Sequence, residues 1–287
     1  MILLQLLING MITGCALGVV AISFALIYAT TKIFHVAHAG VYTLAGYVAW
    51  VMVSHGVPAL LALLAAIVVC AVAGALIQSQ LYDRLAHRRA THLVVLIASL
   101  GLLAIMQNII AMVFSPDILQ FPIPWSTTTI SLGGIRLTST QVLTLACCIA
   151  AYAGTAWFAA FTSLGKRIRA VAANPFLAEI TRLQPRSVYV YVVAIASAIV
   201  ALPGVLVPLD LGLQPYGGIT PLLTATIAMI AGGVGSISGA FLLSIVIAEL
   251  QNLSLLVMPG EWSIGITFFI FVIFMLFRPT GLFTAAR

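Results

Sequence analysis

The chain has 287 residues, of which 63% are hydrophobic and only 6% are charged, and its formal net charge is +6. An average soluble domain carries roughly 25% charged residues, so this composition excludes an ordinary cytosolic enzyme, a nucleic-acid-binding protein and a disordered protein. The excess positive charge is therefore expected in loops on one side of a membrane.

Long runs of the sequence contain no Asp, Glu, Lys or Arg. A helix that crosses a bilayer needs about 20 apolar residues, so the longer of these runs hold two spans each. The runs are continuously apolar rather than alternating, which is unlike a transmembrane β-barrel. The first residues lack a basic region and a cleavage site, so they indicate a first span rather than a removed signal peptide. The charge-free runs are residues 1–31, 33–82, 137–165 and 211–248.

These runs predict an all-α polytopic membrane protein with about eight to ten transmembrane helices, forming one transmembrane domain over residues 1–287. Several spans could be broken or re-entrant, and the seventh is short for a full crossing. In chain order, the expected spans are residues 3–30, 36–53, 58–81, 93–114, 139–162, 188–207, 219–231, 237–257 and 263–277.

Basic residues cluster in three segments, which the positive-inside rule places in the cytoplasm together with the C-terminus. The remaining loops are mostly acidic and are expected outside. The longest of them, residues 115–136, is rich in proline and suits either an outer docking platform or a packed interfacial loop. The basic segments are residues 83–92 with Arg84, Arg88 and Arg89, residues 163–187 with Lys166, Arg167, Arg169, Arg182 and Arg186, and the tail with Arg278 and Arg287.

The second basic segment contains the most informative stretch, residues 165–179. Gly165 can end the preceding helix, and Asn174-Pro175 can turn the chain and start a short helix, since proline suits the first helical position. The stretch therefore predicts a helix–turn–helix at the inner membrane surface. It is either a generic basic loop or a docking element for a soluble cytoplasmic partner.

In this stretch the chain resembles the membrane permeases of ATP-driven (ABC) importers for branched-chain amino acids, on the branch that pairs with a second, related permease. The family's loop that grips the ATPase carries matching Gly, Arg, Ala, Asn-Pro and Ala positions. The family usually has Gly where this chain has Arg182. This difference affects the expected turn after the coupling helix but not the expected docking role. The predicted ATPase-coupling residues are Gly165, Arg167, Arg169, Ala172, Asn174, Pro175, Ala178 and Glu179.

The resemblance runs nearly end to end. It implies a type II-like permease in the bacterial inner membrane that has no catalytic residue and binds no cofactor. ATP and Mg²⁺ would bind two cytoplasmic ATPases, and a second permease and an extracytoplasmic solute-binding protein would complete the importer. The solute would be a branched-chain amino acid or a related small molecule such as urea or an amide. Further matching segments are residues 35–47, 96–108, 232–239, 248–249 and 279–281.

Polar residues at membrane depth are candidates for a translocation path or gate: Tyr28, His35, His38, Tyr42 and Glu249. The two histidines lie one helical turn apart, but no third ligand is near them, so no metal site is expected. They either line a hydrated route or serve structure, with His38 bonding a neighbouring backbone group. The family has Glu where this chain has Gly40, and the loss of that charge would favour a different or less charged solute.

Glu249 lies inside an apolar run, where a carboxylate is costly unless it is paired or faces water. No second acid accompanies it at the same depth, so we expect a structural or path-lining role rather than a proton relay. An ion-coupled carrier that acts without ATPases remains the alternative function.

The chain has a cluster of closely spaced glycines: Gly232, Gly233, Gly235 and Gly239. This stretch lacks the Lys-Ser/Thr ending of a phosphate-binding loop. They instead predict a tight inner turn between two spans. The four cysteines lie in apolar runs without metal-ligand spacing, and no redox role is expected for them.

Overall fold

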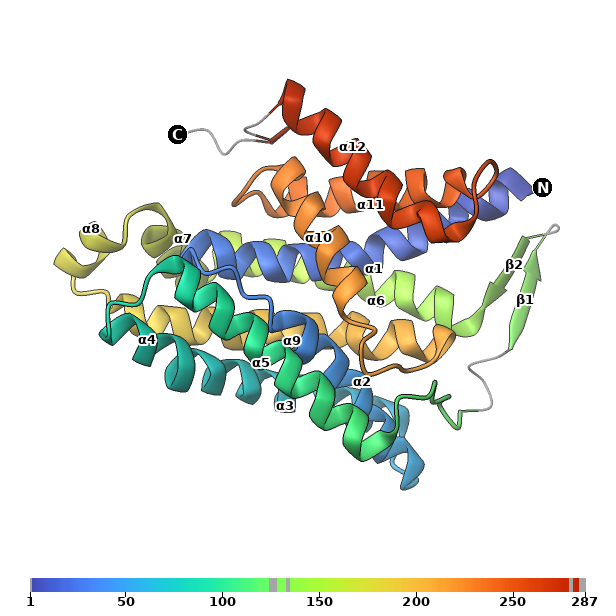
Figure 1. The fold of residues 1–287 in the computed structure, drawn as a ribbon, viewed down its shortest axis with the longest axis horizontal. Coiled ribbons are helices and arrows are strands. Elements are labelled where there is room, and N and C mark those ends of the chain that lie inside the picture. Colours follow the sequence, from blue (N-terminus) through green and yellow to red (C-terminus); the bar gives the residue numbers. More distant parts are fainter. Residues whose placement is uncertain (1, 124–127, 133–134, 279–280, 284–287) are drawn as a thin grey trace.

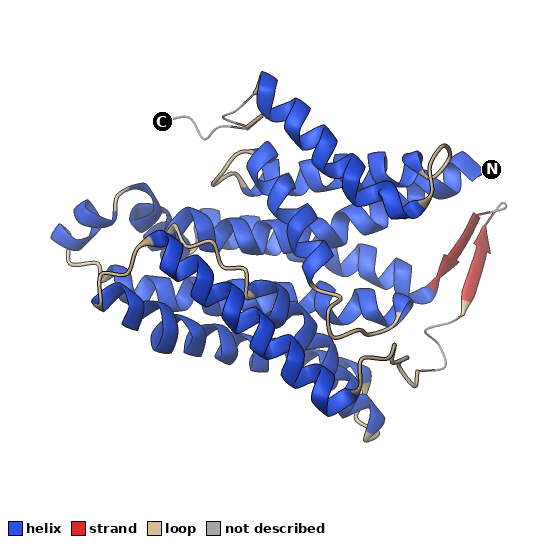
Figure 2. Ribbon diagram, in the orientation of Figure 1, coloured by secondary structure: helices blue, strands red, loops and turns tan. Residues whose placement is uncertain are grey.

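The computed structural model describes residues 2–123, 128–132, 135–278 and 281–283, which form a helical bundle with one small β-hairpin (Figures 1 and 2). Its elements are α1 (Ile2–Thr31), α2 (His38–Ser54), α3 (Ala59–Leu76), the π-helical η1 (Ile77–Tyr82), α4 (Asp83–His87), α5 (His92–Phe114), β1 (Thr129–Leu132), β2 (Ile135–Thr138), α6 (Ser139–Phe161), α7 (Ser163–Ala173), α8 (Pro175–Ile180), α9 (Pro185–Leu211), α10 (Ile219–Gly232), α11 (Ile237–Ser254), the 3-10 turn η3 (Gly260–Trp262) and α12 (Ser263–Phe277).

Seven helices of the described chain are long and apolar enough to cross a membrane. The shorter helices α2, with 17 residues, and α10, with 14 residues, occupy the two remaining predicted spans. The all-α polytopic fold expected from the sequence is therefore confirmed, and the chain is a multi-pass membrane protein. The segment over residues 219–231 is indeed too short to cross alone.

The long loop between α5 and α6 contains a feature that the sequence analysis did not expect. Strands β1 and β2 pair antiparallel, with Thr129 opposite Thr138 and Leu132 opposite Ile135. Before the hairpin, the loop packs on the bundle, because the indole N–H of Trp50 donates to the carbonyl of Gln120 at 3.0 Å. Residues 124–127 of this loop, including Pro124 and Trp125, lie outside the described residues.

The two ends of the bundle differ in charge. At the end formed by α4, α7, α8 and the last turn of α12 lie all the described Lys and Arg residues except Arg136 (Figure 1). Three acidic residues lie toward the opposite end: Asp117 follows α5, Asp210 lies in the last turn of α9, and Glu261 lies in η3 just before α12. This asymmetry is the one that a membrane protein with a defined orientation carries.

Helix α2 begins inside the bundle rather than at its surface. The extended segment 32–37 turns back after α1 and runs along it, so that the Phe34 ring packs on Phe24 with centroids 5.2 Å apart. His38 then reaches Ser23, at 2.8 Å. Since Ser23 lies eight residues before the end of α1, α2 starts roughly 12 Å inward from that end, at 1.5 Å per residue.

Helix α10 repeats this arrangement from the opposite side. After α9, the chain turns at Gly212, whose φ is +90°, and segment 212–218 returns to the middle of the bundle. A Cβ on Gly218 would lie 2.2 Å from the carbonyl oxygen of Ala39, so the N-terminal ends of α2 and α10 touch. From that point the two helices run in opposite directions (Figure 1). Broken helices that meet at mid-depth are a recurring way for transporters to build solute sites.

Candidate functional site

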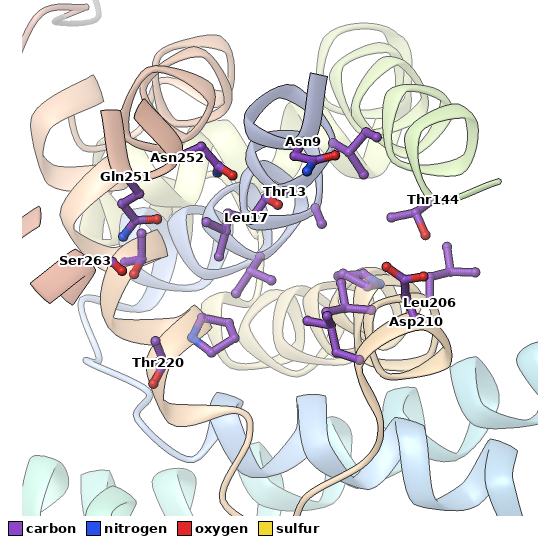
Figure 3. Close-up of a pocket in the computed structure, with 18 of the residues that line it drawn as sticks. Asn9, Thr13, Leu17, Thr144, Leu206, Asp210, Thr220, Gln251, Asn252 and Ser263 are labelled. Atoms are coloured by element: carbon purple, nitrogen blue, oxygen red, sulfur yellow. The ribbon is translucent and has the colours of Figure 1, made fainter. Parts of the chain in front are cut away.

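A cavity of about 540 Å³ is lined by the N-terminal part of α1, the start of α6 and the end of α9, among other segments, and so lies in the half of the bundle opposite α7 and α8. Figure 3 shows residues that line it. Its volume falls within the roughly 300–1,000 Å³ typical of small-molecule sites. Helices α1, α6, α9, α10, α11 and α12 contribute to its wall. Its polar lining residues include Asn9, Thr13, Gln141, Asp210, Thr220, Thr224, Gln251, Asn252 and Ser263.

Helix α1 supplies one long side of this cavity. Residues spaced three or four apart share a helix face, and the lining positions on α1 change from polar near the mouth, at Asn9 and Thr13, to apolar at depth. Leu206 and Val207 of α9 continue the apolar surface. A solute with both polar groups and an aliphatic part would find complementary surfaces here.

Asp210, in the last turn of α9, is the acidic residue of the cavity. Its Oδ1 accepts hydrogen bonds from the hydroxyls of Thr138 and Thr140, at 2.8 and 2.9 Å, and its Oδ2 accepts from the Gln141 amide at 3.0 Å. All three donors belong to the N-terminal end of α6, where a negative charge is favourable. Within the described residues, Asp210 has no ion-pair partner. The carboxylate therefore joins α9 to α6 and keeps a negative charge beside the cavity.

The deep end of the cavity is formed by Tyr42 of α2 and by the first two turns of α10. Tyr42 is 5% exposed and Thr224 is 4% exposed, and both line the cavity. The N-cap of α10 is Gly218, which offers no side-chain oxygen to the first turn. Ile219 N–H instead donates to the carbonyl of Tyr216 at 3.4 Å, and Pro221 has no N–H to satisfy.

The other predicted path residues lie elsewhere. Tyr28 packs on Phe34, with ring centroids 6.2 Å apart. His35 and His38 are fully buried and line neither of the two cavities described for this structure. Their rings lie 5.5 Å apart, and the described residues include no group of three His, Cys, Asp or Glu that could hold a metal ion.

Both histidines instead belong to a buried polar network. Tyr82 donates its hydroxyl proton to Ser99, at 2.8 Å, so His35 Nδ1 must donate to the Tyr82 oxygen 2.6 Å away. Ser99 also accepts the backbone N–H of Ala37, at 3.0 Å. His38 Nε2 lies 2.8 Å from the Ser23 hydroxyl, which itself donates to a backbone carbonyl. The network holds the extended segment before α2 against α1 and α5.

Glu249 lies on α11 and faces Gly10 of α1. A Cβ on Gly10 would come 2.6 Å from its Oε2, and this oxygen is buried with no hydrogen-bond partner among the described residues. Its neighbours Gln251 and Asn252 line the cavity, whereas Glu249 does not. Its role as a path or gate residue stays a prediction.

The predicted coupling loop forms two short helices at the basic end of the bundle. The Asn174 side chain accepts the N–H of Leu177 at 3.1 Å and Pro175 is the first residue of α8, as the sequence predicted. The expectation that Gly165 ends the preceding helix is wrong. Helix α6 ends at Phe161, and Thr162 caps α7 by accepting the N–H of Gly165 at 3.0 Å.

Gly165 has a different physical role. A Cβ at this position would lie 2.3 Å from the carbonyl oxygen of Phe158 and 2.8 Å from that of Ala159. Only glycine therefore lets the first turn of α7 pack against the last turn of α6. Arg169, one turn later on α7, donates to the carbonyl of Ala160 at 3.1 Å and completes the join.

The remaining loop residues follow the amphipathic pattern. Arg167 and Glu179 are exposed, Ala172 is half-buried and Ala178 is buried. Arg182, where the related permeases usually have Gly, adopts a left-handed φ of +63°. The turn is kept, because Leu183 N–H donates to the Ala178 carbonyl at 3.1 Å and Arg182 N–H to that of Glu179 at 3.0 Å, the pattern of a Schellman motif.

The glycine cluster forms a tight turn between α10 and α11, at the basic end of the bundle. A Cβ on Gly232 would lie 2.4 Å from the Gly239 carbonyl, and Gly233 and Gly235 have φ values of +105° and +94°. The described part of the tail joins the turn, since Phe283 N–H donates to the Gly232 carbonyl at 3.0 Å.

One ion pair escaped the sequence analysis. Asp83 Oδ2 lies 2.8 Å from Arg186 Nε, and Gln78 donates to Oδ1 of the same carboxylate at 2.9 Å. The pair ties η1 and α4 to the start of α9, directly after the coupling helices. In the sequence, Asp83 and Arg186 belong to two basic loops that are far apart, so nothing in the sequence indicated that they pair.

Comparisons with known proteins agree with this architecture. The family described as "Branched-chain amino acid transport system / permease component" matches residues 6–275. The high-affinity branched-chain amino acid permease BraD of Pseudomonas aeruginosa is 25% identical over 97% of this chain and 95% of its own. LivH of Escherichia coli K12 is 24% identical over 97% and 94%, respectively. The solved structure of PsaBC from Streptococcus pneumoniae in complex with Fab shares the fold, with a TM-score of 0.52 and 14% identity over 93% of this chain and 90% of that chain.

Proposed function

This chain belongs to the family of permease components of branched-chain amino acid transport systems, and we propose that it works with a second permease, two cytoplasmic ATPases and an extracytoplasmic solute-binding protein. It is a membrane-spanning permease subunit of an ABC importer. ATP and Mg²⁺ would bind the ATPases, and this chain would supply only the path. We place it in a bacterial inner membrane with the C-terminus in the cytoplasm, because the basic end of the bundle should face inward.

The surface of α7 and α8 supports this proposal most directly. Helix α8 exposes three large apolar side chains, Phe176 at 71%, Leu177 at 57% and Ile180 at 64%. Lys166 and Arg167 of the neighbouring helix α7 are exposed as well. A surface at the end of a bundle that mixes apolar and basic side chains is better suited to contact with a soluble protein partner than to contact with the interior of the bilayer.

The same geometry offers a route for coupling. Movement of a docked ATPase would press on α8, and α7 would transmit it to α6 through Gly165 and Arg169. Helix α6 in turn holds Asp210 at the cavity through Thr138, Thr140 and Gln141. One continuous helix thus connects the docking surface with the solute cavity.

The substitution Arg169→Glu tests the docking role. It reverses a charge on the partner-facing segment and replaces a donor to the Ala160 carbonyl with an acceptor, and repulsion at a docking surface costs several kcal/mol. We expect normal membrane insertion, with co-purified ATPase and solute uptake both reduced at least about tenfold. Arg88→Glu is the matched control, because Arg88 is exposed at the same end but lies on the other basic loop. Full ATPase recovery together with normal uptake in Arg169→Glu would contradict the proposal.

The substitution Glu249→Gln separates the importer from the ion-coupled alternative. An ATP-driven permease has no need of a titratable proton at this position, and a neutral amide is cheaper than a charge in hydrocarbon. We expect uptake to change only modestly and, in both forms, to survive an uncoupler while the cellular ATP level is clamped. Uptake that disappears with the uncoupler at constant ATP would instead support the carrier.

A further inference from the structure

We propose that a second cavity, at the basic end of the bundle, binds an anionic phospholipid with a phosphatidylglycerol-type headgroup. The cavity has a volume of about 320 Å³, which is the size of a small-molecule site. Helices α1, α6, α7 and α11 and the turn between α10 and α11 form its wall. It shares no lining residue with the cavity that contains Asp210.

The cavity lies at the level where membrane-spanning helices end. Helix α1 ends at Thr31 and α6 ends at Phe161, whereas α11 begins at Ile237. All three are long and apolar enough to cross a membrane, so their shared end marks the boundary between hydrocarbon and headgroups. Helix α7 contacts α1 at this end (Figure 1). A lipid headgroup therefore has direct access to this level of the bundle.

The charged side chains that line the cavity are both cations, Lys32 directly after α1 and Arg169 of α7. Among the described residues, no Asp or Glu lines it, and the one ion pair joins Arg186 to Asp83. Arginine binds phosphate through several N–H groups and lysine through a compact charge. Arg169 uses an N–H of one terminal nitrogen for the Ala160 carbonyl, which leaves other donors. A zwitterionic headgroup would bring an ammonium group near two cations, so the site favours a net negative lipid.

The rest of the wall suits an acyl chain. Among the described lining residues, Thr30 has the one uncharged polar side chain, and its hydroxyl already donates to the Leu26 carbonyl at 2.9 Å. Leu26, Phe158, Ile168 and Ile237 belong to the apolar part. Free phosphate would leave this surface uncovered, whereas the first carbons of an acyl chain would cover it. Basic pockets between membrane helices are a typical setting for anionic lipid headgroups.

Native mass spectrometry of the purified full-length chain in detergent tests the site. The probes are dioleoylphosphatidylglycerol and dioleoylphosphatidylethanolamine, which carry the same acyl chains. Lys32→Asn removes the charge, and asparagine tolerates the left-handed φ of +57° at this position. Arg89→Asn is the matched control, because Arg89 is exposed at the same end, has a φ of +53° and lines neither cavity. Arg169 is left unchanged, because it also joins α7 to α6.

We expect the first phosphatidylglycerol to bind at least about fivefold more tightly than phosphatidylethanolamine. Its affinity should fall about fivefold in Lys32→Asn and stay unchanged in Arg89→Asn, because one cation near a lipid surface contributes about this factor. Equal affinity for the two lipids would overturn the assignment. An equal loss in both variants would also overturn it, because general surface charge would then explain the binding.

A third variant tests the apolar part of the cavity. Ala29 lines the wall beside Lys32, and Ala29→Leu fills part of the space without changing any charge, so phosphatidylglycerol should bind more weakly. Unchanged binding in Ala29→Leu, or full displacement of the lipid by inorganic phosphate, would show that the cavity does not hold a lipid. Neither ATPase nor solute is present in these measurements, so their outcome is independent of the proposed function.

Discussion

Replacing Gly14 with Val should destabilise the bundle markedly. A Cβ at this position would lie 2.6 Å from the Cα of Ile245, which is backbone and cannot move aside as a flexible side chain can. Overpacking of a tight contact costs about 1–3 kcal/mol and sometimes more. We expect a loss near the upper limit, because valine adds two methyl groups beyond the clash. In a chain of this size, that corresponds to a fall in melting temperature of about 5–10 °C.

The contact belongs to a stripe of small residues that lets two helices approach closely. Gly10, Gly14 and Gly18 are spaced four apart on α1 and face Glu249, Ile245 and Phe241 of α11. Spacing of this kind typically permits close helix packing in membranes. The control is Gly101→Val, since a Cβ there would meet nothing within 4 Å. Equal melting temperatures for the two purified variants in detergent would show that the α1–α11 contact is not rigid.

The sequence alone predicted the helices well because membrane spans depend on local hydropathy. Each predicted span corresponds to a helix of the structure, and the short seventh span became α10. The start of α8 was also predictable, because an N-cap Asn followed by Pro acts within a single turn. These features need no information from distant parts of the chain.

The break between α1 and α2 was predicted, since one expected span ended at residue 30 and the next began at residue 36, but the position of the start of α2 inside the bundle was not. Local hydropathy marks where the apolar run is interrupted, near Lys32 and His35, but it carries no information on how deep in the bundle the next helix begins. What holds the segment extended is long-range: the His35–Tyr82 bond joins residues 47 positions apart, and the Ala37–Ser99 bond joins residues 62 positions apart. Tertiary hydrogen bonds here override the local preference for helix.

The cavity was hidden for a similar reason. Asp210 falls beyond the expected span 188–207 and was therefore expected in one of the acidic outer loops, yet it lies in the last turn of α9 and bonds to residues about 70 positions earlier. The one indication in the sequence that Asp210 lies within a membrane helix is that it directly follows the apolar residues Val207-Pro-Leu.

Replacing Gly165 with Val should abolish transport while leaving the membrane bundle folded. A Cβ here would lie 2.3 Å from the Phe158 carbonyl oxygen and 2.9 Å from the Cα of Ala159, so α7 would have to separate from α6. That separation would also break the Arg169–Ala160 hydrogen bond and the capping of α7 by Thr162. The docking surface would then be present but disconnected from the helix that holds Asp210.

The measurements that follow from this are uptake, ATP hydrolysis and melting temperature of the assembled transporter. We expect uptake to fall at least about a hundredfold, since the loss of a rigid contact of roughly 3 kcal/mol corresponds to that factor. The melting temperature should change little, because α7 packs at the end of the bundle. Gly154→Val, on α6 where a Cβ would meet nothing within 4 Å, is the control and should transport normally. Normal uptake in Gly165→Val would mean that the α6–α7 contact plays no part in coupling.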